Sequence, residues 1–337
     1  MGVSSGRVTI ADIAAEAGVS VPTVSRVLNG RDDVASETRG RIEELLQRHD
    51  YRPPGVRSRT AAKLIDVVFG DLDSPWAVEI IRGVEDVAHR AGVGTVVWAV
   101  HDESTSARQW WENVQSRTSD GVILVTSHLD AKLEAEVRHL PTVVVDPSGL
   151  PSIDVPTIGA TNWAGGLSAT EHLVQLGHRR IGCIAGTPRL LCSGARLGGY
   201  RAALDAGGIE YDADLVYTGD FRNESGFLGG QALLDRSDPP TAIFASSDQM
   251  ALGVYEAVRR CGLRVPGDVS IVGFDDLPES RWASPPLTTV RQPLVEMGML
   301  AARTILALSR GEDIEKLRIE LATNLVVRES TSAPARA

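Results

Sequence analysis

The sequence predicts an α/β protein with a small N-terminal head of three helices and a larger body of two doubly wound parallel sheets. The first fifty residues contain short amphipathic stretches separated by glycine, whereas the remainder alternates apolar runs with helical stretches. The chain has 337 residues, enough for about two domains. Hydrophobic residues make up 43% and charged residues 23%, an ordinary globular composition that excludes a disordered or fibrous chain.

The first predicted helix begins after Thr9, which fits a capping box together with Asp12. In such a box each side chain satisfies an amide that lacks a partner at the helix start. Apolar residues then recur at the i, i+3, i+4 and i+7 positions from Ile10 onward, so one face of the helix is apolar. Gly18 is expected to end the helix because glycine adopts the left-handed conformation of a C-cap.

Ser20 is expected to cap a second helix that ends at Asn29-Gly30, and a third helix is predicted from near Ser36 to about His49. Only residues 18–20 separate the first two helices. Two short helices joined by such a tight glycine turn are typical of a helix-turn-helix, whose second helix enters the major groove of DNA. A generic helical hairpin is the alternative that these residues leave open.

The second helix has five predicted outward positions. These are Val21, Pro22, Ser25, Arg26 and Asn29. Arg26 is the long side chain with several donors, which suits a guanine edge or a phosphate, and Val21 could contact a thymine methyl group.

The net charge of −10 argues against nucleic acid when it is considered alone, because a phosphate backbone favours a basic partner. The charge is unevenly distributed, however. Residues 1–60 carry a net charge of +1 and the other 277 residues carry −11. Such an asymmetry is consistent with a nucleic-acid-binding head on an acidic body.

A long ordered signature supports the helix-turn-helix. It comprises TIADIA at residues 9–14, AGVSVPTVSRVLNG at 17–30, Val34, ETR at 37–39 and YRP at 51–53. This signature resembles the N-terminus of the lactose-repressor (LacI/GalR) family. The DNA-binding residues that the head and linker then imply are Thr9, Ser20, Val21, Pro22, Thr23, Ser25, Arg26, Asn29, Arg52, Val56, Arg57 and Arg59.

The linker at residues 53–63 departs from the family pattern. In the family this segment forms a hinge helix that folds on DNA and inserts a leucine into the minor groove. Here it is about three residues shorter, has no leucine at that place, and contains proline and glycine, which are poor helix formers. Arg57, Arg59 and Lys63 are candidates for phosphate or minor-groove contacts, and Val56 is the candidate wedge. A plain basic linker is the alternative.

Strand–helix alternation in the body predicts βαβ units, and therefore parallel sheets with helices on both faces. The predicted strands are residues 64–69, 95–100, 121–125, 142–145, 181–185, 242–245 and 270–274. The predicted helices are residues 78–90, 107–115, 167–176, 199–206, 226–234 and 250–260. Ligands of doubly wound sheets bind outside the carboxyl ends of the strands.

The family resemblance continues through the body and covers about residues 8–331. Its landmarks are DLDSPW at 71–76, DGVI at 120–123, GHRRI at 177–181, RLGGY at 196–200, GDF at 219–221, SDQMALG at 247–253, VGFDD at 272–276, PLTTV at 286–290 and LVVREST at 325–331. The resemblance implies the fold of periplasmic sugar-binding proteins, in which the chain crosses more than once between two α/β subdomains with a ligand cleft. The expected domains are 1–52, a linker at 53–63, 64–331 and a tail at 332–337.

The effector-binding residues implied in the body lie at or near strand ends. They are Trp76, Asp146, Arg196, Phe221, Ser247 and Asp275. A carboxylate such as Asp275 suits sugar hydroxyls, with a helix N-cap as its alternative role, and Arg196 supplies five donors, with a surface salt bridge as its alternative. Trp76 suits the apolar face of a sugar, or subdomain packing. Ser247 stands where the family usually has asparagine, and Thr161 where aspartate is common.

Other functions find little support in the sequence. The chain lacks nucleotide-binding, serine-hydrolase and zinc-protease motifs, and Asp275-Asp276 cannot flank one glycosidic bond because adjacent residues on an extended chain point to opposite sides. The cysteines, Cys183, Cys192 and Cys261, lack metal-site spacing and are expected to be reduced structural thiols. No cofactor, metal or catalytic residue is predicted, and His172 and His178 are read as structural. The sequence leaves open whether four tryptophans belong to the core, a dimer contact or the rim of the cleft: Trp98, Trp110, Trp111 and Trp163.

The sequence therefore predicts a cytoplasmic, non-enzymatic transcriptional regulator, and the resemblance favours a repressor. The start of the chain has no signal-peptide pattern, and no apolar stretch is long enough to span a membrane. A homodimer is expected to bind a pseudo-palindromic DNA operator under the control of a small-molecule effector, most often a sugar in this family. Induced release and induced binding both remain open. The alternative, a sugar-binding receptor without DNA function, is disfavoured by the helix-turn-helix.

Overall fold

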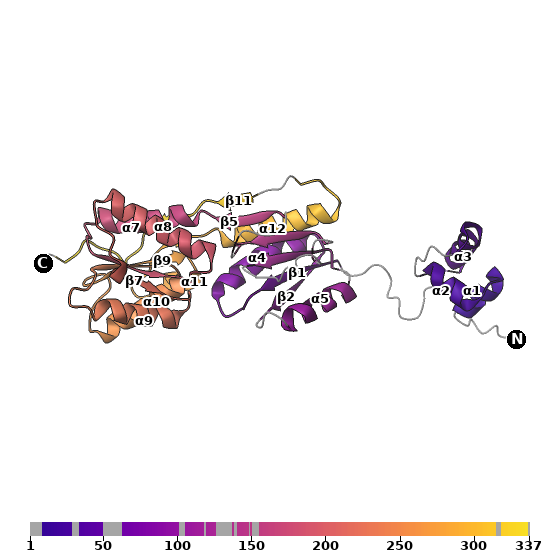
Figure 1. The fold of residues 1–337 in the computed structure, drawn as a ribbon, viewed down its shortest axis with the longest axis horizontal. Helices are drawn as coiled ribbons and strands as arrows, with labels where there is room; N and C mark the ends of the chain where they lie inside the picture. Colours follow the sequence, from indigo (N-terminus) through magenta and orange to yellow (C-terminus); the bar gives the residue numbers. More distant parts are fainter. Residues whose placement is uncertain are drawn as a thin grey trace. The chain divides into compact units, whose positions relative to one another are not determined.

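The computed structural model describes residues 9–28, 34–49, 63–100, 105–117, 119–125, 137, 140–147, 149, 155–314 and 318–335. The chain divides into two compact units, Met1–Ala62 and Lys63–Ala337 (Figure 1). The predicted linker at 53–63 lies almost entirely outside the described residues, so its conformation stays a prediction.

The first unit contains the three predicted helices, α1 (Ile10–Ala17), α2 (Val21–Leu28) and α3 (Ser36–Arg48). The capping box is confirmed, because the Asp12 amide donates to Thr9 Oγ1 and the Thr9 amide donates to Asp12 Oδ2. Gly18 is confirmed as the C-cap, with φ at 65° in the left-handed region. Local sequence signals therefore determine where α1 begins and ends.

A single hydrophobic core holds the three helices together. The buried side chains come from the predicted inward positions, namely Ile13, Ala14, Ala17, Val24, Val27, Ile42 and Leu45. Ile10, Val19, Val34 and Leu46 pack around this core while partly exposed. Because the apolar stripes of all three helices are used in the core, the opposite faces are left for other contacts.

The second unit begins with a six-stranded parallel sheet in the order β11-β5-β4-β3-β1-β2. Its strands are β1 (Leu64–Phe69), β2 (Gly94–Ala99), β3 (Gly121–Val125), β4 (Thr142–Val145), β5 (Thr157–Ala160) and β11 (Arg318–Leu321). Its helices are α4 (Pro75–Arg90), α5 (Thr105–Arg117) and α12 (Leu294–Ser309). Ile65 and Val67 of β1 pack in the core that α4 and α12 cover, whereas Val68 packs with α5 on the other face. We call this part the N-subdomain.

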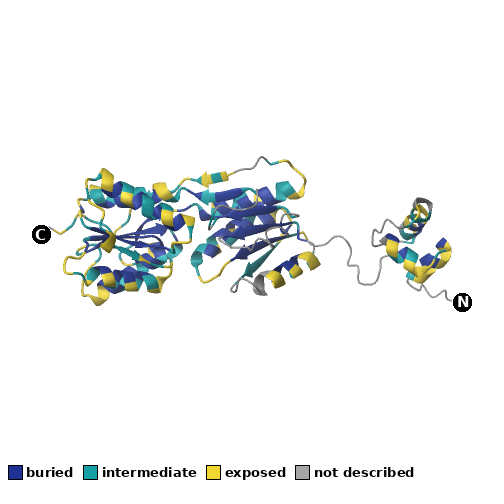
Figure 2. Cartoon of the chain, viewed as in Figure 1, coloured by how far each residue is buried: buried dark blue, intermediate teal, exposed yellow. Residues whose placement is uncertain are grey.

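The second sheet has the order β12-β10-β9-β8-β6-β7, and all its pairs are parallel except β10 with β12. Its strands are β6 (Ile181–Ala185), β7 (Val216–Thr218), β8 (Ala242–Ala245), β9 (Ser270–Asp275), β10 (Thr288–Arg291) and β12 (Asn324–Val326). Its helices are α7 (Asn162–Gln175), α8 (Leu191–Ala206), α9 (Asn223–Leu234), α10 (Asp248–Arg260) and α11 (Pro278–Trp282), with a 3-10 turn at Ala213–Leu215. α7 and α8 cover one face, and α9 and α10 cover the other. We call this part the C-subdomain. Figure 2 shows that the strands between the helices of each subdomain are mostly buried.

The described chain crosses between the two subdomains at three places: after β5, after β10 and after β11. Two of these crossovers are hydrogen-bonded to each other, since the Thr161 amide donates to the Leu321 carbonyl at 3.0 Å. In addition, the Thr323 amide donates to Thr161 Oγ1 at 2.9 Å. The predicted doubly wound fold with repeated crossing is confirmed, and Thr161 has a role in joining the crossovers.

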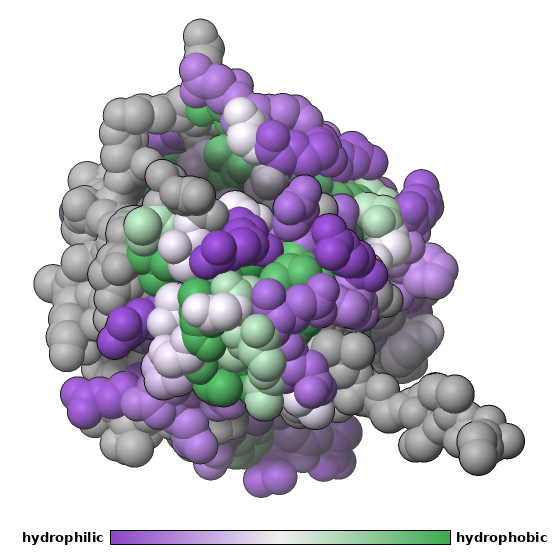
Figure 3. Space-filling model, turned by 90° about the vertical axis from the view of Figure 1, so that its right-hand side faces the viewer, coloured by the Kyte–Doolittle hydropathy of each residue, from purple (hydrophilic) through white to green (hydrophobic). Residues whose placement is uncertain are grey.

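The structure corrects several predicted elements. It adds the strands β5, β7, β10, β11 and β12, which have only three or four residues and no long apolar run, together with the helices α11 and α12. The six predicted body helices begin two to eight residues earlier than expected, and β2 is shifted by one residue. None of the described helices combines the length and apolar character that crossing a membrane requires. Figure 3 shows a described surface on which hydrophilic residues surround separate apolar patches.

Candidate functional site

The exposed face of α2 carries much of the predicted DNA-binding set. Val21 is 40% exposed, Pro22 and Arg26 are exposed, and Ser25 is partly exposed. Val24 and Val27 of the same helix are buried. The helix therefore uses one stripe for the core and presents the other to the outside, which is the arrangement that a recognition helix needs.

The remaining head predictions have different outcomes. Ser20 and Thr23 lie side by side at the start of α2, with 2.8 Å between their hydroxyl oxygens. Thr9 is exposed, but its hydroxyl donates to Asp12 at 2.6 Å, and this hydrogen bond lowers the pKa of Asp12. The other predicted DNA-binding residues lie outside the described part of the chain. They are Asn29, Arg52, Val56, Arg57 and Arg59.

A cavity of about 520 Å³ lies between the two subdomains, at the carboxyl ends of strands from both sheets. All six predicted effector residues line it, although they are spread over 200 positions of the sequence. The full lining is Phe69, Gly70, Asp71, Asp73, Ser74, Trp76, Ala77, Val125, Asp146, Thr187, Arg189, Leu190, Cys192, Arg196, Asp220, Phe221, Arg222, Ser247, Gln249 and Asp275. We call it the main cavity.

Arg196 occupies the floor of the main cavity and is only 3% exposed. It lies in the second turn of α8, because this helix begins at Leu191 and not at the predicted residue 199. Its Nη1 donates to the Ser246 carbonyl at 2.5 Å, and its Nε donates to Asn162 Oδ1 at 2.9 Å. The guanidinium also lies 3.7 Å from the centre of the Phe274 ring, a cation–π contact. These contacts fix the orientation of the guanidinium, which is buried and not part of a surface salt bridge.

Asp275 is the buried carboxylate beside this arginine. Its Oδ1 lies 3.7 Å from Arg196 Nη1 and accepts a hydrogen bond of 2.6 Å from Gln292 Nε2. Burial raises the pKa of Asp275 to about 6, while Arg196 and Gln292 act in the opposite direction. Burial also raises the pKa of Asp146, again opposed by Arg196. Asp275 does not cap a helix, since α11 begins three residues later with Leu277 at its N-cap.

The neighbouring carboxylate, Asp276, points away from the main cavity. It is paired with Arg328, with Arg291 at 2.6 Å, and with Ser280. Burial opposes the ionised form, but the hydrogen bonds from Arg328 and Arg291 prevail and lower the pKa of Asp276. The two aspartates therefore face different surroundings, as expected for adjacent residues at the end of a strand.

Backbone strain is concentrated at this cavity. Among the described residues other than glycine, positive φ angles occur at four positions. They are Asp146 (46°), Phe221 (71°), Asp275 (120°) and Asp276 (58°). The first, second and third of these line the cavity. Residues held in such conformations cost about 1–3 kcal/mol each and are typical of functional sites.

Phe221 and Ser247 lie on the C-subdomain side of the main cavity. The Phe221 ring packs on Gly186, where an added Cβ would lie 1.9 Å from a ring carbon, so the ring position requires glycine there. Ser247 donates to the Phe221 carbonyl at 3.0 Å and accepts from the Met250 amide as the cap of α10. Its hydroxyl therefore has a structural role as well as a place in the lining. Trp76 is half-buried in the first turn of α4, on the N-subdomain side.

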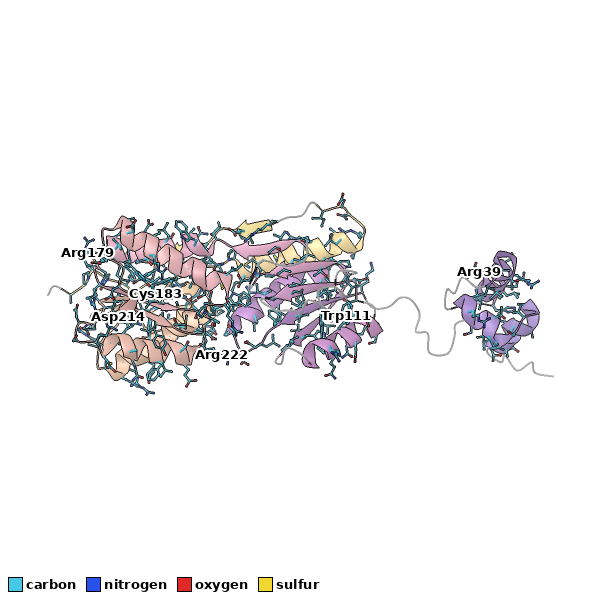
Figure 4. The ribbon with its side chains drawn as sticks, in the orientation of Figure 1. Arg39, Trp111, Arg179, Cys183, Asp214 and Arg222 are labelled. Atoms are coloured by element: carbon cyan, nitrogen blue, oxygen red, sulfur yellow. The ribbon has the colours of Figure 1, made fainter. Side chains whose placement is uncertain are left out.

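One ion-pair group joins the two subdomains at the rim of the main cavity. Arg222 belongs to the C-subdomain and is labelled in Figure 4. It lies 3.4 Å from Asp71 and 3.3 Å from Asp73 of the N-subdomain. None of these three residues is among the predicted effector contacts. Asp71 and Asp73 follow a predicted strand, which is where ligand-binding residues are expected. Arg222 is a single exposed arginine after a three-residue strand, and no sequence pattern indicates a site there.

Cys192 and His178 have structural roles. Burial raises the pKa of Cys192 to about 12, so this cavity-lining thiol stays protonated. His178 binds Thr241, Ser270 and the Ser332 carbonyl, which ties the predicted tail to the body, and burial lowers its pKa. The described residues contain no cluster of acidic, histidine and cysteine side chains suited to a metal.

The structure also shows the positions of His172 and of the four tryptophans whose roles the sequence leaves open. Trp110 and Trp111 belong to α5 and are buried in the core that this helix forms with the sheet. Trp98 packs against that core and donates to Asp66 at 2.8 Å, whereas Trp163 is largely exposed. His172 lies 2.9 Å from Thr331 Oγ1, in a structural contact.

The comparisons with known proteins cover both units. A model of bacterial regulatory proteins of the lacI family matches residues 9–54, and a model of the periplasmic binding protein-like domain matches residues 170–331. The HTH-type transcriptional repressor CytR of Escherichia coli K12 is 36% identical over 330 residues, which cover 96% of each chain.

Solved structures agree with these matches. The transcriptional regulator CelR in complex with cellobiose has a TM-score of 0.74 and 36% identity, over 96% of this chain and all of that chain. The Lac repressor dimer bound to operator and the anti-inducer ONPF has a TM-score of 0.72 and 30% identity, over 97% of this chain and all of that chain. The chain belongs to the LacI family of bacterial regulatory proteins.

Proposed function

We propose that this protein is a transcriptional repressor that binds a specific DNA operator as a cytoplasmic homodimer and releases it when a sugar binds in the main cavity. The observation that carries this proposal is the meeting of six predicted effector residues in one cavity, in a chain whose first unit presents a recognition helix. A sugar-binding receptor without DNA function would have no use for that helix.

The DNA contacts are assigned to the outward face of α2. Val21 and Pro22 stand in the first turn and Arg26 one turn later, so their side chains can reach base edges while the buried stripe holds the helix. In a two-fold dimer, two such helices read the two halves of a pseudo-palindromic operator. Arg26 is the residue suited to bidentate contact with guanine.

The effector contacts are assigned to the six cavity residues. Asp275 and Asp146 offer carboxylate oxygens, Arg196 offers donors, and Trp76 and Phe221 offer aromatic faces. This combination fits a neutral polyhydroxylated ring, whose hydroxyl groups need both donors and acceptors and whose C–H face is apolar. The related CelR structure, which contains cellobiose, is consistent with a sugar of this type.

The charged residues of the cavity floor are connected directly to the crossovers. Arg196 donates to Asn162, which follows the first crossover, and Asp275 accepts from Gln292, which lies in the second. A ligand that binds Arg196 and Asp275 therefore contacts residues that are hydrogen-bonded to the crossover segments. Such a ligand can shift the angle between the subdomains, provided that it binds one arrangement more tightly than the other.

We infer that the protein is not an enzyme. The known family members to which it is similar are regulators. The cavity supports this inference, because the Cys192 thiol is held protonated by burial and Asp275 and Asp276 face different surroundings.

The proposed function can be tested in two steps. First, operator sequences are selected from random duplex DNA with the purified protein, and we expect a pseudo-palindromic site. Selection of no defined site would contradict the DNA-binding assignment. Second, a thermal-shift screen compares sugars, sugar phosphates and nucleosides, since a ligand of the folded state raises its melting temperature. We expect a sugar to raise it and to release the operator in a gel shift. Release by a nucleoside alone would overturn the sugar assignment but leave the repressor assignment intact.

A further inference from the structure

A second cavity of about 400 Å³ lies on the crossover side of the same unit. Its walls come from β5, β11 and the first turns of α7 and α8. The lining residues are Asp146, Pro147, Thr157, Gly159, Ala160, Thr161, Asn162, Trp163, Ala164, Leu191, Cys192, Ala195, Arg318, Ile319 and Glu320. None of the six effector residues except Asp146 belongs to it, and we call it the side cavity.

The side cavity and the main cavity share two residues, Asp146 and Cys192. Both cavities are therefore bounded by the same side chains, and a ligand that fills the main cavity along this wall lies next to the side cavity. Asp146 has a positive φ of 46°, and its amide donates to the Ile158 carbonyl at 2.8 Å. The shared boundary is therefore held in place by the backbone of the N-subdomain sheet.

Trp163 gives the side cavity an exposed aromatic ring. It is 49% exposed, although a large apolar ring is stabilised by burial. The ring is supported from below by Gly198, where an added Cβ would lie 3.2 Å from Trp163 Cδ1. An exposed and supported aromatic ring is suited to stacking on the apolar face of a sugar.

Polar groups surround this ring. Thr157, Thr161 and Asn162 line the inner wall, and the exposed residues Arg318 and Glu320 of β11 provide one charge of each sign. This set provides donors and acceptors without a net charge at the rim. The chemistry therefore favours a neutral ring with hydroxyl groups over an anionic ligand such as a phosphate.

We propose that the side cavity binds the second ring of an oligosaccharide effector, stacked on Trp163, while the first ring occupies the main cavity. This inference rests on the proposed function and narrows the effector from sugars in general to oligosaccharides. It also places the second ring against Thr161 and Asn162, at the first crossover. An effector with two rings would thus contact the first crossover between the subdomains directly.

The test compares ligands of increasing length on four proteins by titration calorimetry. The probes are mono-, di- and trisaccharides of glucose, xylose, galactose and mannose. The proteins are the wild type, Trp163→Ala, Trp163→Phe and the control Trp282→Ala, whose tryptophan is 77% exposed but lies outside both cavities. We expect a disaccharide to bind the wild type most tightly and Trp163→Ala at least about tenfold more weakly. Trp163→Phe should recover part of the loss, and the affinity for the matching monosaccharide should change less than about twofold.

A second variant fills the side cavity and leaves the Trp163 ring in place. A Cβ at Gly159 would meet no atom within 4 Å, so the methyl groups of Gly159→Val would enter the open space of the side cavity. This variant should weaken disaccharide binding and leave monosaccharide binding and operator binding unchanged.

The outcomes separate this inference from the proposed function. If monosaccharides bind, release the operator and show the tightest affinity, or if Trp163→Ala weakens all sugars equally, the side-cavity assignment is overturned while the proposed function stands. If no saccharide binds the wild type, the sugar effector and the side-cavity assignment fall together.

Discussion

The head and the body hold their functional residues in opposite ways. In the head, most of the described candidate DNA contacts are exposed or partly exposed side chains of one eight-residue helix, which packs on a core of seven buried apolar residues. In the body, the candidate effector contacts come from segments between Trp76 and Asp275, and the charged ones are buried. The head therefore presents a surface, whereas the body encloses a site.

This difference has consequences for how each region tolerates change. An exposed contact residue of α2 can be removed at little cost to the fold, because the core lies on the other side of the helix. A charged residue of the cavity floor has partners that would remain buried without it. Substitutions of exposed α2 residues such as Arg26 should thus affect mainly DNA binding, and substitutions at the cavity floor should affect both effector response and stability.

The largest effect is expected for Arg196→Ala. This change leaves the Asp275 carboxylate without its nearby positive charge and removes the donors to Ser246 and Asn162. Loss of one partner of a buried charge pair costs about 3–5 kcal/mol of stability, and truncation at a ligand contact costs about 2–5 kcal/mol of affinity. We expect effector affinity to fall by about thirtyfold or more, measured by calorimetry, with a lower melting temperature.

Arg201→Ala is the matched control for this change. Arg201 lies on the same helix but is exposed and donates to the Tyr211 hydroxyl instead of the cavity floor. It should bind effector like the wild type. If Arg196→Ala retained the wild-type affinity, the assignment of the effector to the main cavity would be wrong.

The next effect belongs to the head. Arg26→Ala removes an exposed side chain of α2, and a bidentate base contact is worth about 1–3 kcal/mol. We expect operator affinity to fall by about 5- to 150-fold in a gel shift, with unchanged effector binding and specificity relaxed at one base pair of each half-site. Arg310→Ala, an exposed body residue paired with Glu312, makes the same change in charge and should not alter operator binding. A uniform loss over all DNA sequences would instead identify Arg26 as a phosphate contact.

The third prediction concerns pH. The pKa of Asp275 is about 6 in the folded protein, above its ordinary value of 3.8, because of burial. Its contribution to stability is therefore full below about pH 4 and is lost as the pH rises through 6. An effector that needs the carboxylate should bind most tightly above pH 6 and lose up to about tenfold in affinity per pH unit below it. Arg196, Gln292, Asp146 and Asp248 all act on this group.

Calorimetric titrations between pH 5 and pH 7.5 test this dependence. Asp275→Asn carries no titratable carboxyl and should bind weakly at every pH, with a flat profile. A wild-type affinity that stays constant over this range would show that the effector does not depend on the ionised form of Asp275.

The same contrast explains what the sequence could predict. The head was predicted helix by helix, because its caps, its glycine turn and its apolar spacing all act within a few residues. The long buried strands of the body were equally visible. Short strands such as β7 and β12 were missed, because three residues carry no periodic signal and depend on their neighbours in the sheet.

The cavity shows the limit of this reasoning more clearly. Its six predicted residues were found through family landmarks, and the structure brings them together. Gln292 and Asn162, which connect the cavity floor to the crossovers, were not predicted. Their roles arise from contacts across 17 and 34 positions of the chain, and a glutamine before a proline looks like an ordinary loop residue.

The smallest predicted effect concerns the exposed ion pairs that join the two subdomains. Arg222 lies within 3.4 Å of Asp71 and Asp73, but all three side chains are largely exposed, and such pairs are worth about 0.2–1 kcal/mol. If these contacts favour the closed cleft, Arg222→Ala should weaken effector binding by about two- to fivefold at low salt and much less at high salt, because exposed charges are screened. Arg236→Ala, which breaks an ion pair with Asp214 within the C-subdomain, should have no effect on the affinity. A tighter effector affinity in Arg222→Ala would reverse the interpretation, since the three residues would then restrict entry to the cavity.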